Sequence, residues 1–314
     1  MNTTTQRKPR VLGIVGATAS AKTALSLPLA QALDCEIVCM DSMQIYRRMD
    51  IGTAKPTADE RALIPHHMLD IAEPTEPFSV AQYVEQARAV IADIVQRGRV
   101  PMLVGGTGLY LQGLTLPMDY GGLPSDPAVR KRLTEQAERE GAAGMHARLA
   151  AVDPPAAARL HPNDQRRVIR ALEIYELTGI PMSQHRTPTQ ADAPYDFSLY
   201  AVDWPRAELH ARINQRVDQM LASGLMQEVQ ALLDSGVPED AQSMQGLGYK
   251  ELLPCLHGDI SPAQAAEAIK VGTRNYARRQ LIWFRRDTRI RWIPSVELSH
   301  AKERIIQDWE EHIR

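Results

Sequence analysis

The sequence predicts an α/β fold, in which a parallel-sheet core with a phosphate-binding loop (P-loop) is interrupted by an inserted all-helical domain. Three observations predict this fold. Short apolar runs alternate with helical patterns in the first third of the chain, and a glycine-led loop joins the first run to the first helical pattern. Residues 116–197, in contrast, show helical patterns only.

Four short apolar runs in the first third of the chain are predicted strands, because turn or polar residues bound each of them. They span residues 11–15, 36–40, 68–71 and 100–104. Residues 22–33 and 79–97 have the spacing of amphipathic helices, with Ser79 as the N-cap and Gly98 just beyond the end of the second helix. Strand–helix–strand alternation predicts a parallel sheet that is covered on both faces.

The inserted domain is predicted from a change of pattern near residue 116. Prolines and glycines between residues 117 and 127 form a linker, and a helical stretch at 128–178 follows, with breaks at 154–155 and 161–162. A second proline-bearing segment at 187–194 precedes a predicted strand at 198–202. The core domain therefore comprises residues 1–115 and 198–314, with further helices near 205–221, 225–233 and 261–284 and a last strand at 290–293.

Composition excludes several classes of protein. The chain has 314 residues, of which 44% are hydrophobic and 24% charged, so a substantial core is expected and bulk disorder is excluded. Its net charge of −2 argues against a uniformly basic nucleic-acid coat and a purely electrostatic membrane binder. The first apolar run is too short for a signal peptide, and no apolar stretch approaches the roughly 20 residues that span a bilayer. Three scattered cysteines suit a reducing compartment, and we expect a cytoplasmic monomer without membrane contact.

A P-loop is predicted at residues 16–23, which follow the first strand and lead directly into a helix. In such a loop, backbone N–H groups surround an anion, the lysine reaches an outer phosphate and the next hydroxyl can bind Mg²⁺. Ala21 takes the place of the usual glycine, where its methyl group either crowds the phosphate or forbids a positive φ. The alternative is an ordinary strand–turn–helix corner. The candidate phosphate-binding residues are Gly16, Ala17, Thr18, Ala19, Ser20, Ala21, Lys22 and Thr23.

Two further strand ends carry polar residues that are expected to face the same crevice. Asp41 follows the second strand, at the edge where parallel sheets bind ligands. Three roles are open for it: a Mg²⁺ ligand, a base that takes a proton from a nucleophile, or a cap or turn residue. Thr107 lies in the glycine-rich turn after the fourth strand, where it either contacts a ligand or caps a helix.

Arginines concentrate in two places that suggest a polyanionic partner. Residues 274–291 contain seven arginines and one acidic residue, with Tyr276, Trp283 and Phe284 among them. A second cluster in the insertion consists of Arg166, Arg167 and Arg170. Such clusters favour contacts with several phosphates, and the planar side chains can stack on bases. The alternative is a solvated basic helix face.

The histidines and cysteines are predicted to be structural. His66, His67, His161 and His185 lack the compact spacing of a metal site. Cys35 and Cys39 lie on the same side of a predicted strand, as core thiols do.

Together, these motifs resemble those of the tRNA dimethylallyltransferases. Residues 41–56 are specific enough to indicate this family on their own. The motifs follow one another in the family's order over nearly the whole chain. Two residues depart from the family's pattern, because Ala21 replaces a glycine and Ala17 a common proline. The resemblance rests on residues 16–23, 41–56, 105–110, 161–164, 170–173, 246–250, 273–280 and 283–285.

The resemblance implies transfer of a dimethylallyl group from dimethylallyl diphosphate to N6 of the adenosine 3′ of the anticodon, in tRNAs that read codons beginning with U. Residues 16–23 would hold the donor's diphosphate rather than ATP, with Mg²⁺ near Thr23. Lys22, Mg²⁺ and an arginine of the pair Arg212 and Arg216 would neutralise the leaving diphosphate. Asp41 matches the general base that accepts the N6 proton, and Thr107 matches a residue that orients this base and the nucleotide.

The resemblance also implies a surface for the tRNA anticodon stem-loop, to which the inserted domain contributes. The target adenine has to leave the stacked loop, as base-modifying enzymes require. The matching residues are Asp41, Ser42, Met43, Gln44, Thr107, Gln165, Arg166, Arg167, Val168, Ile169, Gln245, Gly246, Leu247, Gly248, Tyr249, Lys250, Arg278, Arg279, Gln280, Leu281, Ile282, Trp283, Phe284 and Arg285, with Arg130 as a further member.

Functions of two other classes remain open. A P-loop small-molecule or nucleoside kinase explains the loop, with Asp41 on Mg²⁺, but leaves the arginine clusters without a role. An RNA-binding protein without enzymatic activity explains the arginines but gives Asp41 and Thr107 no task. Consumption of the ATP γ-phosphate identifies the kinase, and a prenyl group gained by bound tRNA excludes the pure binder.

Overall fold

A computed structural model describes residues 8–116, 124–185 and 193–311 of the chain. The chain divides into two compact units, one of Met1–Thr115 with Ala193–Arg314 and the other of Leu116–Asp192. Most of the two linkers expected at 117–127 and 187–194 lies outside the described residues. None of the helices in these ranges combines the length and the apolar character that crossing a bilayer requires.

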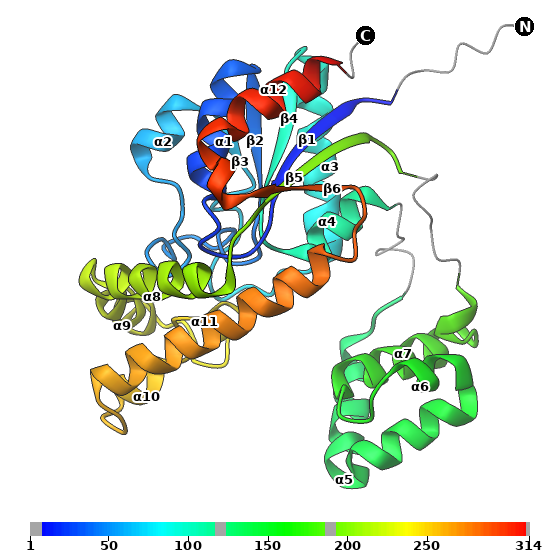
Figure 1. The fold of residues 1–314 in the computed structure, drawn as a ribbon. Coiled ribbons are helices and arrows are strands. Elements are labelled where there is room, and N and C mark those ends of the chain that lie inside the picture. The colour runs from blue at the N-terminus through cyan, green and yellow to red at the C-terminus, as the bar shows by residue number, and fades with distance from the viewer. Residues whose placement is uncertain (1–7, 117–123, 186–192, 312–314) are drawn as a thin grey trace, which may run out of the picture. The chain divides into compact units, whose positions relative to one another are not determined.

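A parallel sheet of six strands forms the centre of the first unit, as predicted (Figure 1). β1 pairs in parallel with β4 on one side and with β5 on the other, so the two segments of this unit join in the middle of the sheet. The strands, in spatial order, are β3 (His66–His67), β2 (Cys35–Met40), β4 (Val100–Gly105), β1 (Arg10–Val15), β5 (Asp196–Asp203) and β6 (Ile290–Pro294).

Helices cover both faces of the sheet. On one face, α1 (Lys22–Ala32) and α12 (Ala301–Glu311) share an apolar cluster with the strands, in which Leu29 and Trp309 are buried. On the other face lie α3 (Val80–Gln96) and α4 (Gly108–Thr115), where the rings of Tyr83 and Tyr110 stack with centroids 3.8 Å apart. The remaining α-helices in the described part of the unit are α2 (Ala58–Leu63), α8 (Arg206–Ala222), α9 (Leu225–Asp234), α10 (Leu253–Leu256) and α11 (Pro262–Phe284).

Local sequence explains where the longer helices begin and end. The predicted N-cap Ser79 is confirmed: its side chain accepts from the N–H of Gln82, whose side chain in turn bonds the N–H of Ser79. Ser261 and Gln264 form the same capping box at α11, with Pro262 in its first turn. Gly98, just beyond α3, has a φ of 75°, which is the left-handed conformation expected there.

Two sequence-based boundaries are wrong. Residues 68–71 do not form a strand, because Met68 and Asp70 have φ values of 63° and 55°, which no extended strand accommodates. The edge strand is instead the short β3, just before them. β5 begins at Asp196 rather than at residue 198, so residues 196 and 197 pair with β1 and belong to the sheet.

The second unit is helical in its described part. It contains α5 (Pro127–Val152), α6 (Pro154–Arg159), α7 (Gln165–Thr178) and a short 3₁₀ turn, η1 (Met182–Gln184). Asp126 and Asp153 cap α5 and α6, and each is followed by proline at the first helical position. The buried carboxylate of Glu173 accepts hydrogen bonds from Arg130 and Arg170, so these two arginines stabilise the unit from within.

Candidate functional site

The P-loop leaves the carboxyl end of β1 and enters α1, as predicted. Lys22 turns back over the loop, where its Nζ donates to the carbonyl oxygens of Gly16 (3.2 Å) and Ala17 (2.6 Å). The buried Ala17 and Ala19 belong to one apolar cluster with Ile213 of α8. Apolar packing against α8 therefore fixes the loop in addition to the bonds from Lys22.

Ala21 adopts the conformation that the sequence argued against. Its φ and ψ are 69° and 23°, in the left-handed region, and Ala19 has a φ of 61°. Of the two effects expected of this methyl group, the exclusion of a positive φ is therefore wrong, and the crowding of a phosphate stays a prediction. The backbone follows the course that glycine would take, at the cost of strain at an alanine.

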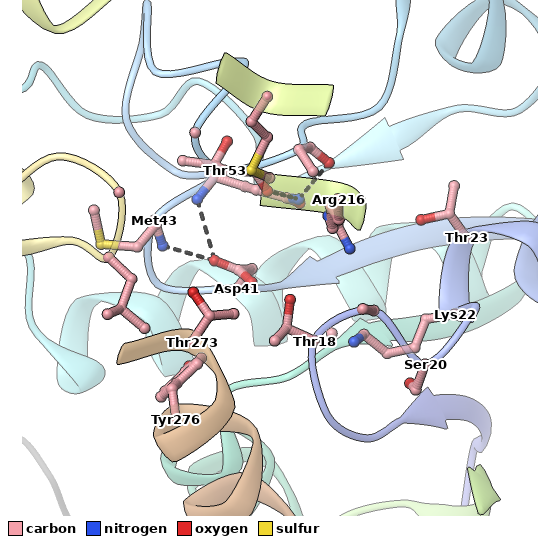
Figure 2. Close-up of a pocket in the computed structure, with 18 of the residues that line it drawn as sticks. Thr18, Ser20, Lys22, Thr23, Asp41, Met43, Thr53, Arg216, Thr273 and Tyr276 are labelled. Carbon is pink, nitrogen blue, oxygen red and sulfur yellow. Dashed lines mark hydrogen bonds between the residues drawn. The ribbon is translucent and has the colours of Figure 1, made fainter. Parts of the chain in front are cut away.

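A cavity of about 810 Å³ opens in front of the P-loop. Its walls come from the loop, from the segments that follow β2, and from α8 and α11 (Figure 2). Most of the predicted site residues of the first unit meet here. Those that line the cavity are Thr18, Ala19, Ser20, Ala21, Lys22, Thr23, Asp41, Ser42, Met43, Gln44, Arg212, Arg216, Gln245, Gly246, Leu247, Gly248, Tyr249, Lys250, Arg279 and Gln280.

Asp41 is held in the cavity wall by the turn that it begins. Its Oδ1 accepts hydrogen bonds from the N–H groups of Met43 (2.9 Å) and Gln44 (3.4 Å), which are drawn in Figure 2. Within the described part of the chain no hydrogen bond to Oδ2 is found, so one carboxylate oxygen is available to a ligand. The turn role and a chemical role are thus compatible in one side chain.

Thr107 supports this turn and is absent from the cavity lining. Its N–H donates to the carbonyl oxygen of Met40 (3.2 Å), and its Oγ1 accepts from the N–H of Ser42 (3.0 Å). These bonds connect the end of β4 to the residues that flank Asp41. Thr107 can therefore act through the orientation of Asp41.

Two cations, Lys22 and Arg216, share the P-loop end of the cavity. Burial lowers the pKa of Lys22 to about 8, and the charge of Arg216 contributes to this shift, while the charge of Asp41 opposes it. Burial also lowers the pKa of Arg216, against the attraction of Asp41. Desolvated cations that repel each other are stabilised by a bound anion, so this end of the cavity suits a diphosphate.

Arg212 and Arg216, which sequence reasoning could not separate, have different surroundings. The Nε of Arg212 donates to the carbonyl oxygen of Ala19 (2.9 Å), and its guanidinium lies over the ring of Trp204, 4.2 Å from the centroid. For Arg216, no hydrogen bond to the described residues is found. Arg216 is thus the arginine of this pair that is available to a ligand (Figure 2).

Gln280 connects two loops at the base of the cavity. Its Oε1 accepts from the N–H of Thr18 (2.9 Å), and its Nε2 donates to the carbonyl oxygen of Gly106 (2.8 Å). A Cβ at residue 106 would collide with this amide, which explains the glycine there. The buried Gln280 therefore holds the P-loop next to the turn that follows β4.

The other residues assigned to tRNA contact differ in their exposure. Several side chains are buried and can contribute only through the backbone or through support of their neighbours; they are Val168, Ile169, Tyr249, Gln280 and Phe284. Exposed side chains are those of Gln165, Arg166, Arg167, Gln245, Lys250, Arg278, Arg279, Ile282 and Arg285. The first three lie on α7 of the second unit, where Arg130 is held by Glu173.

Sequence reasoning missed several residues of the site. Thr53, Thr273 and Tyr276 line the cavity, and Figure 2 shows the last two on α11 across from Asp41. Glu228 lies on α9, where its carboxylate accepts from the N–H groups of residues 50–52 and from the hydroxyl of Tyr249 (2.6 Å). It thereby fixes the segment that contains Thr53. Thr53 lies in the quoted motif at 41–56, and Thr273 and Tyr276 lie in the one at 273–280, whereas no sequence signal pointed to Glu228.

His66 and His67 have structural partners, and Cys35 and Cys39 lie in the interior. His67 Nε2 lies 2.7 Å from Glu36 Oε2, and His66 Nδ1 lies 2.7 Å from the carbonyl oxygen of Ile64. Cys35 and Cys39 are buried free thiols. Among the described residues, no group of three or more His, Cys, Asp or Glu side chains is arranged to hold a metal.

Comparison with known proteins shows which family the chain belongs to. The model of the family described as IPP transferase matches residues 44–287, and a model described as isopentenyl transferase matches residues 9–69. The chain belongs to the IPP transferase family. It is 51% identical over 294 residues to the tRNA dimethylallyltransferase 1 of Trichlorobacter lovleyi, covering 93% of this chain and 96% of that one.

Solved structures of IPP transferase relatives share the fold. The full-length tRNA isopentenylpyrophosphate transferase of Bacillus halodurans matches with a TM-score of 0.72 and 40% identity, over 97% of this chain and 98% of that one. A eukaryotic dimethylallyltransferase acting on tRNA matches with a TM-score of 0.78 and 30% identity, over 93% of this chain and 75% of that one. The resemblance that the motifs predicted is thereby confirmed.

Proposed function

We propose that this enzyme, which as an IPP transferase transfers a prenyl group to tRNA, uses dimethylallyl diphosphate as the donor. The acceptor is N6 of the adenosine 3′-adjacent to the anticodon in tRNAs that read codons beginning with U, and the products are N6-(dimethylallyl)adenosine and diphosphate. One observation supports this proposal: a cavity has Lys22 and Arg216 at its P-loop end and a carboxylate, Asp41, facing the same space. Cations for a leaving diphosphate and an acceptor for a proton are what this transfer needs.

The P-loop binds the donor through its diphosphate. Backbone N–H groups at the start of α1 and the ammonium of Lys22 surround the phosphates. Arg216 approaches from α8 and stabilises the negative charge that grows on the leaving diphosphate as the allylic C–O bond breaks. Binding of this anion favours the protonated state of Lys22 and so opposes the lowering of its pKa by burial.

Mg²⁺ fits this site as a partner of the diphosphate. It usually takes few protein ligands together with substrate phosphates and water, and the exposed Thr23 offers a hydroxyl at the cavity. The described residues contain no cluster that would hold such an ion by itself. When bound, Mg²⁺ would supply additional positive charge to the diphosphate.

Asp41 acts on the acceptor. The N6 lone pair of adenine is delocalised into the ring, so removal of an N6 proton assists attack on the allylic carbon. In the transfer, the N6–C bond forms, the C–O bond breaks, and the proton passes to the free oxygen of Asp41. Thr107 and the N–H groups of Met43 and Gln44 keep this carboxylate in place.

The tRNA anticodon stem-loop binds to exposed basic side chains of both units. In the first unit these include Lys250, Arg278 and Arg285, and in the second Arg166 and Arg167. The first unit, Met1–Thr115 with Ala193–Arg314, acts as the catalytic core, and the insertion contributes to tRNA contact. We propose that the enzyme works as a monomer, in the cytoplasm where its tRNA is found.

A kinase function is not favoured. The relatives named above are tRNA dimethylallyltransferases and isopentenyl transferases, and a kinase would leave the basic surfaces without a task. The decisive experiment incubates the enzyme with dimethylallyl diphosphate and unmodified tRNA, followed by mass spectrometry of the nucleosides. We expect one prenylated adenosine per tRNA and no consumption of ATP. Consumption of the γ-phosphate of ATP without prenylated adenosine would contradict the proposal.

A further inference from the structure

Two side chains outside the P-loop hold two consecutive carbonyl groups of the loop. Arg212 Nε donates to the carbonyl oxygen of Ala19 (2.9 Å), and Trp204 Nε1 donates to that of Ser20 (3.2 Å). The two side chains also contact each other, because the guanidinium of Arg212 lies over the indole ring. Together they form a clamp between α8, the end of β5 and the loop.

The clamped carbonyl groups lie in the strained part of the loop. Ala19 and Ala21, on either side of Ser20, both have left-handed backbones, with φ values of 61° and 69°. Side chains disfavour this conformation, whereas glycine adopts it readily. Ser20 is 2% exposed and its hydroxyl has no hydrogen-bond partner in the described residues, so the hydroxyl does not stabilise the loop. External bonds to the carbonyl groups of Ala19 and Ser20 therefore help to hold these alanines, beside the packing of Ala19 against Ile213.

We propose that Arg212 and Trp204 are positioning residues, which keep the alanine-containing P-loop in its diphosphate-binding conformation. Arg216, in contrast, contacts the leaving diphosphate itself. The inference rests on the proposed function of the P-loop as the donor site. It assigns the two arginines of α8 to different tasks and explains how this chain tolerates alanine at position 21.

The test is a double-mutant cycle of Arg212→Ala and Ala21→Gly, with KM for dimethylallyl diphosphate measured at saturating tRNA. Loss of a charged hydrogen-bond donor predicts a donor KM about 10- to 100-fold higher in Arg212→Ala, with a smaller change in kcat. Ala21→Gly should lower this raised KM at least about threefold, yet change the wild-type KM less than about twofold, because residues that share a strained loop couple. The exposed Arg206, on the same helix, supplies the control: Arg206→Ala should leave both constants unchanged.

Milder variants keep the proposal testable if Arg212→Ala does not fold, which thermal unfolding without ligand would reveal. Trp204→Phe retains the ring below the guanidinium but removes the bond to Ser20, and Arg212→Lys retains a donor. Both should raise the donor KM less than Arg212→Ala, and the KM for tRNA should stay constant throughout. Arg216→Ala, by comparison, should lose mainly kcat, without rescue by Ala21→Gly.

A lower kcat at unchanged donor KM in Arg212→Ala, with no rescue by Ala21→Gly, would overturn the clamp and assign Arg212 to the leaving group. Binding of inorganic diphosphate to each variant, measured by calorimetry, separates this from failure of the proposed function. If the wild type binds diphosphate but forms no prenylated adenosine, the proposed function fails. The clamp is then judged on diphosphate affinity, and equal affinities of wild type and Arg212→Ala would refute it.

Discussion

Replacement of Ala21 by glycine should stabilise the protein, although glycine normally destabilises. Alanine in the left-handed region costs about 1–2 kcal/mol, which glycine does not incur. Against this, glycine gains conformational freedom in the unfolded chain, worth about 0.4–1 kcal/mol. The midpoints of these two effects differ by about 0.8 kcal/mol, so the free energy of unfolding should rise by about that amount for Ala21→Gly.

The assay is thermal unfolding without ligand, supported by denaturant titration. For a protein of this size, the expected gain raises Tm by about 1–3 °C. Ala92→Gly is the matched control, since Ala92 is exposed in the middle of α3 with a helical backbone. That change should lower the free energy of unfolding by about 1 kcal/mol. A loss of stability in Ala21→Gly equal to that in Ala92→Gly would refute the left-handed assignment of Ala21 and the strain argument with it.

Three further predictions concern the proposed chemistry. Asp41→Asn should retain the turn and the affinity for tRNA, since the amide oxygen can still accept from the N–H of Met43. Turnover should fall about 10²- to 10⁴-fold, and a near wild-type rate would contradict the assignment of Asp41 as the base. Charge reversal at Arg278 and Arg285 should weaken tRNA binding with little effect on donor KM, and an equal loss for both substrates would indicate misfolding. The affinity of the wild type for tRNA should fall with salt, with a log–log slope of about −0.7 to −0.9 per neutralised phosphate. Because burial lowers the pKa of Lys22 to about 8, its ammonium is lost as the pH rises through that value, so donor Kd should increase up to about tenfold per pH unit above pH 8. Lys22→Arg should remove this step, and a flat donor Kd from pH 7 to pH 10 in the wild type would exclude a role for the ammonium.

The sequence was sufficient where function depends on a local motif. The P-loop and Asp41 follow strands whose apolar runs are plain, so their meeting at one edge of a parallel sheet could be predicted. The same local reasoning failed at residues 68–71, where an apolar run hides two left-handed residues. The spacing of apolar residues indicates which side chains are buried, but it does not indicate the sign of the backbone angle φ.

Residues that act over long sequence separations could not be found in this way. Glu228 binds the N–H groups of residues 50–52, and Gln280 bonds Thr18, yet neither belongs to a pattern that indicates its partner. The distinction between Arg212 and Arg216 is likewise invisible in the sequence, where both are arginines one helical turn apart. Their roles depend on which one meets Trp204 and Ala19.

Single-turnover transfer, with both products counted, tests the central claim most directly. Enzyme saturated with unmodified tRNA is mixed with a limiting amount of dimethylallyl diphosphate, and released diphosphate and prenylated adenosine are quantified at the same time points. Direct attack of N6 on the allylic carbon, with diphosphate held by the P-loop, predicts equal amounts of both products at every time. Release of diphosphate without an equal amount of prenylated adenosine would contradict it, because the donor would then be hydrolysed rather than transferred.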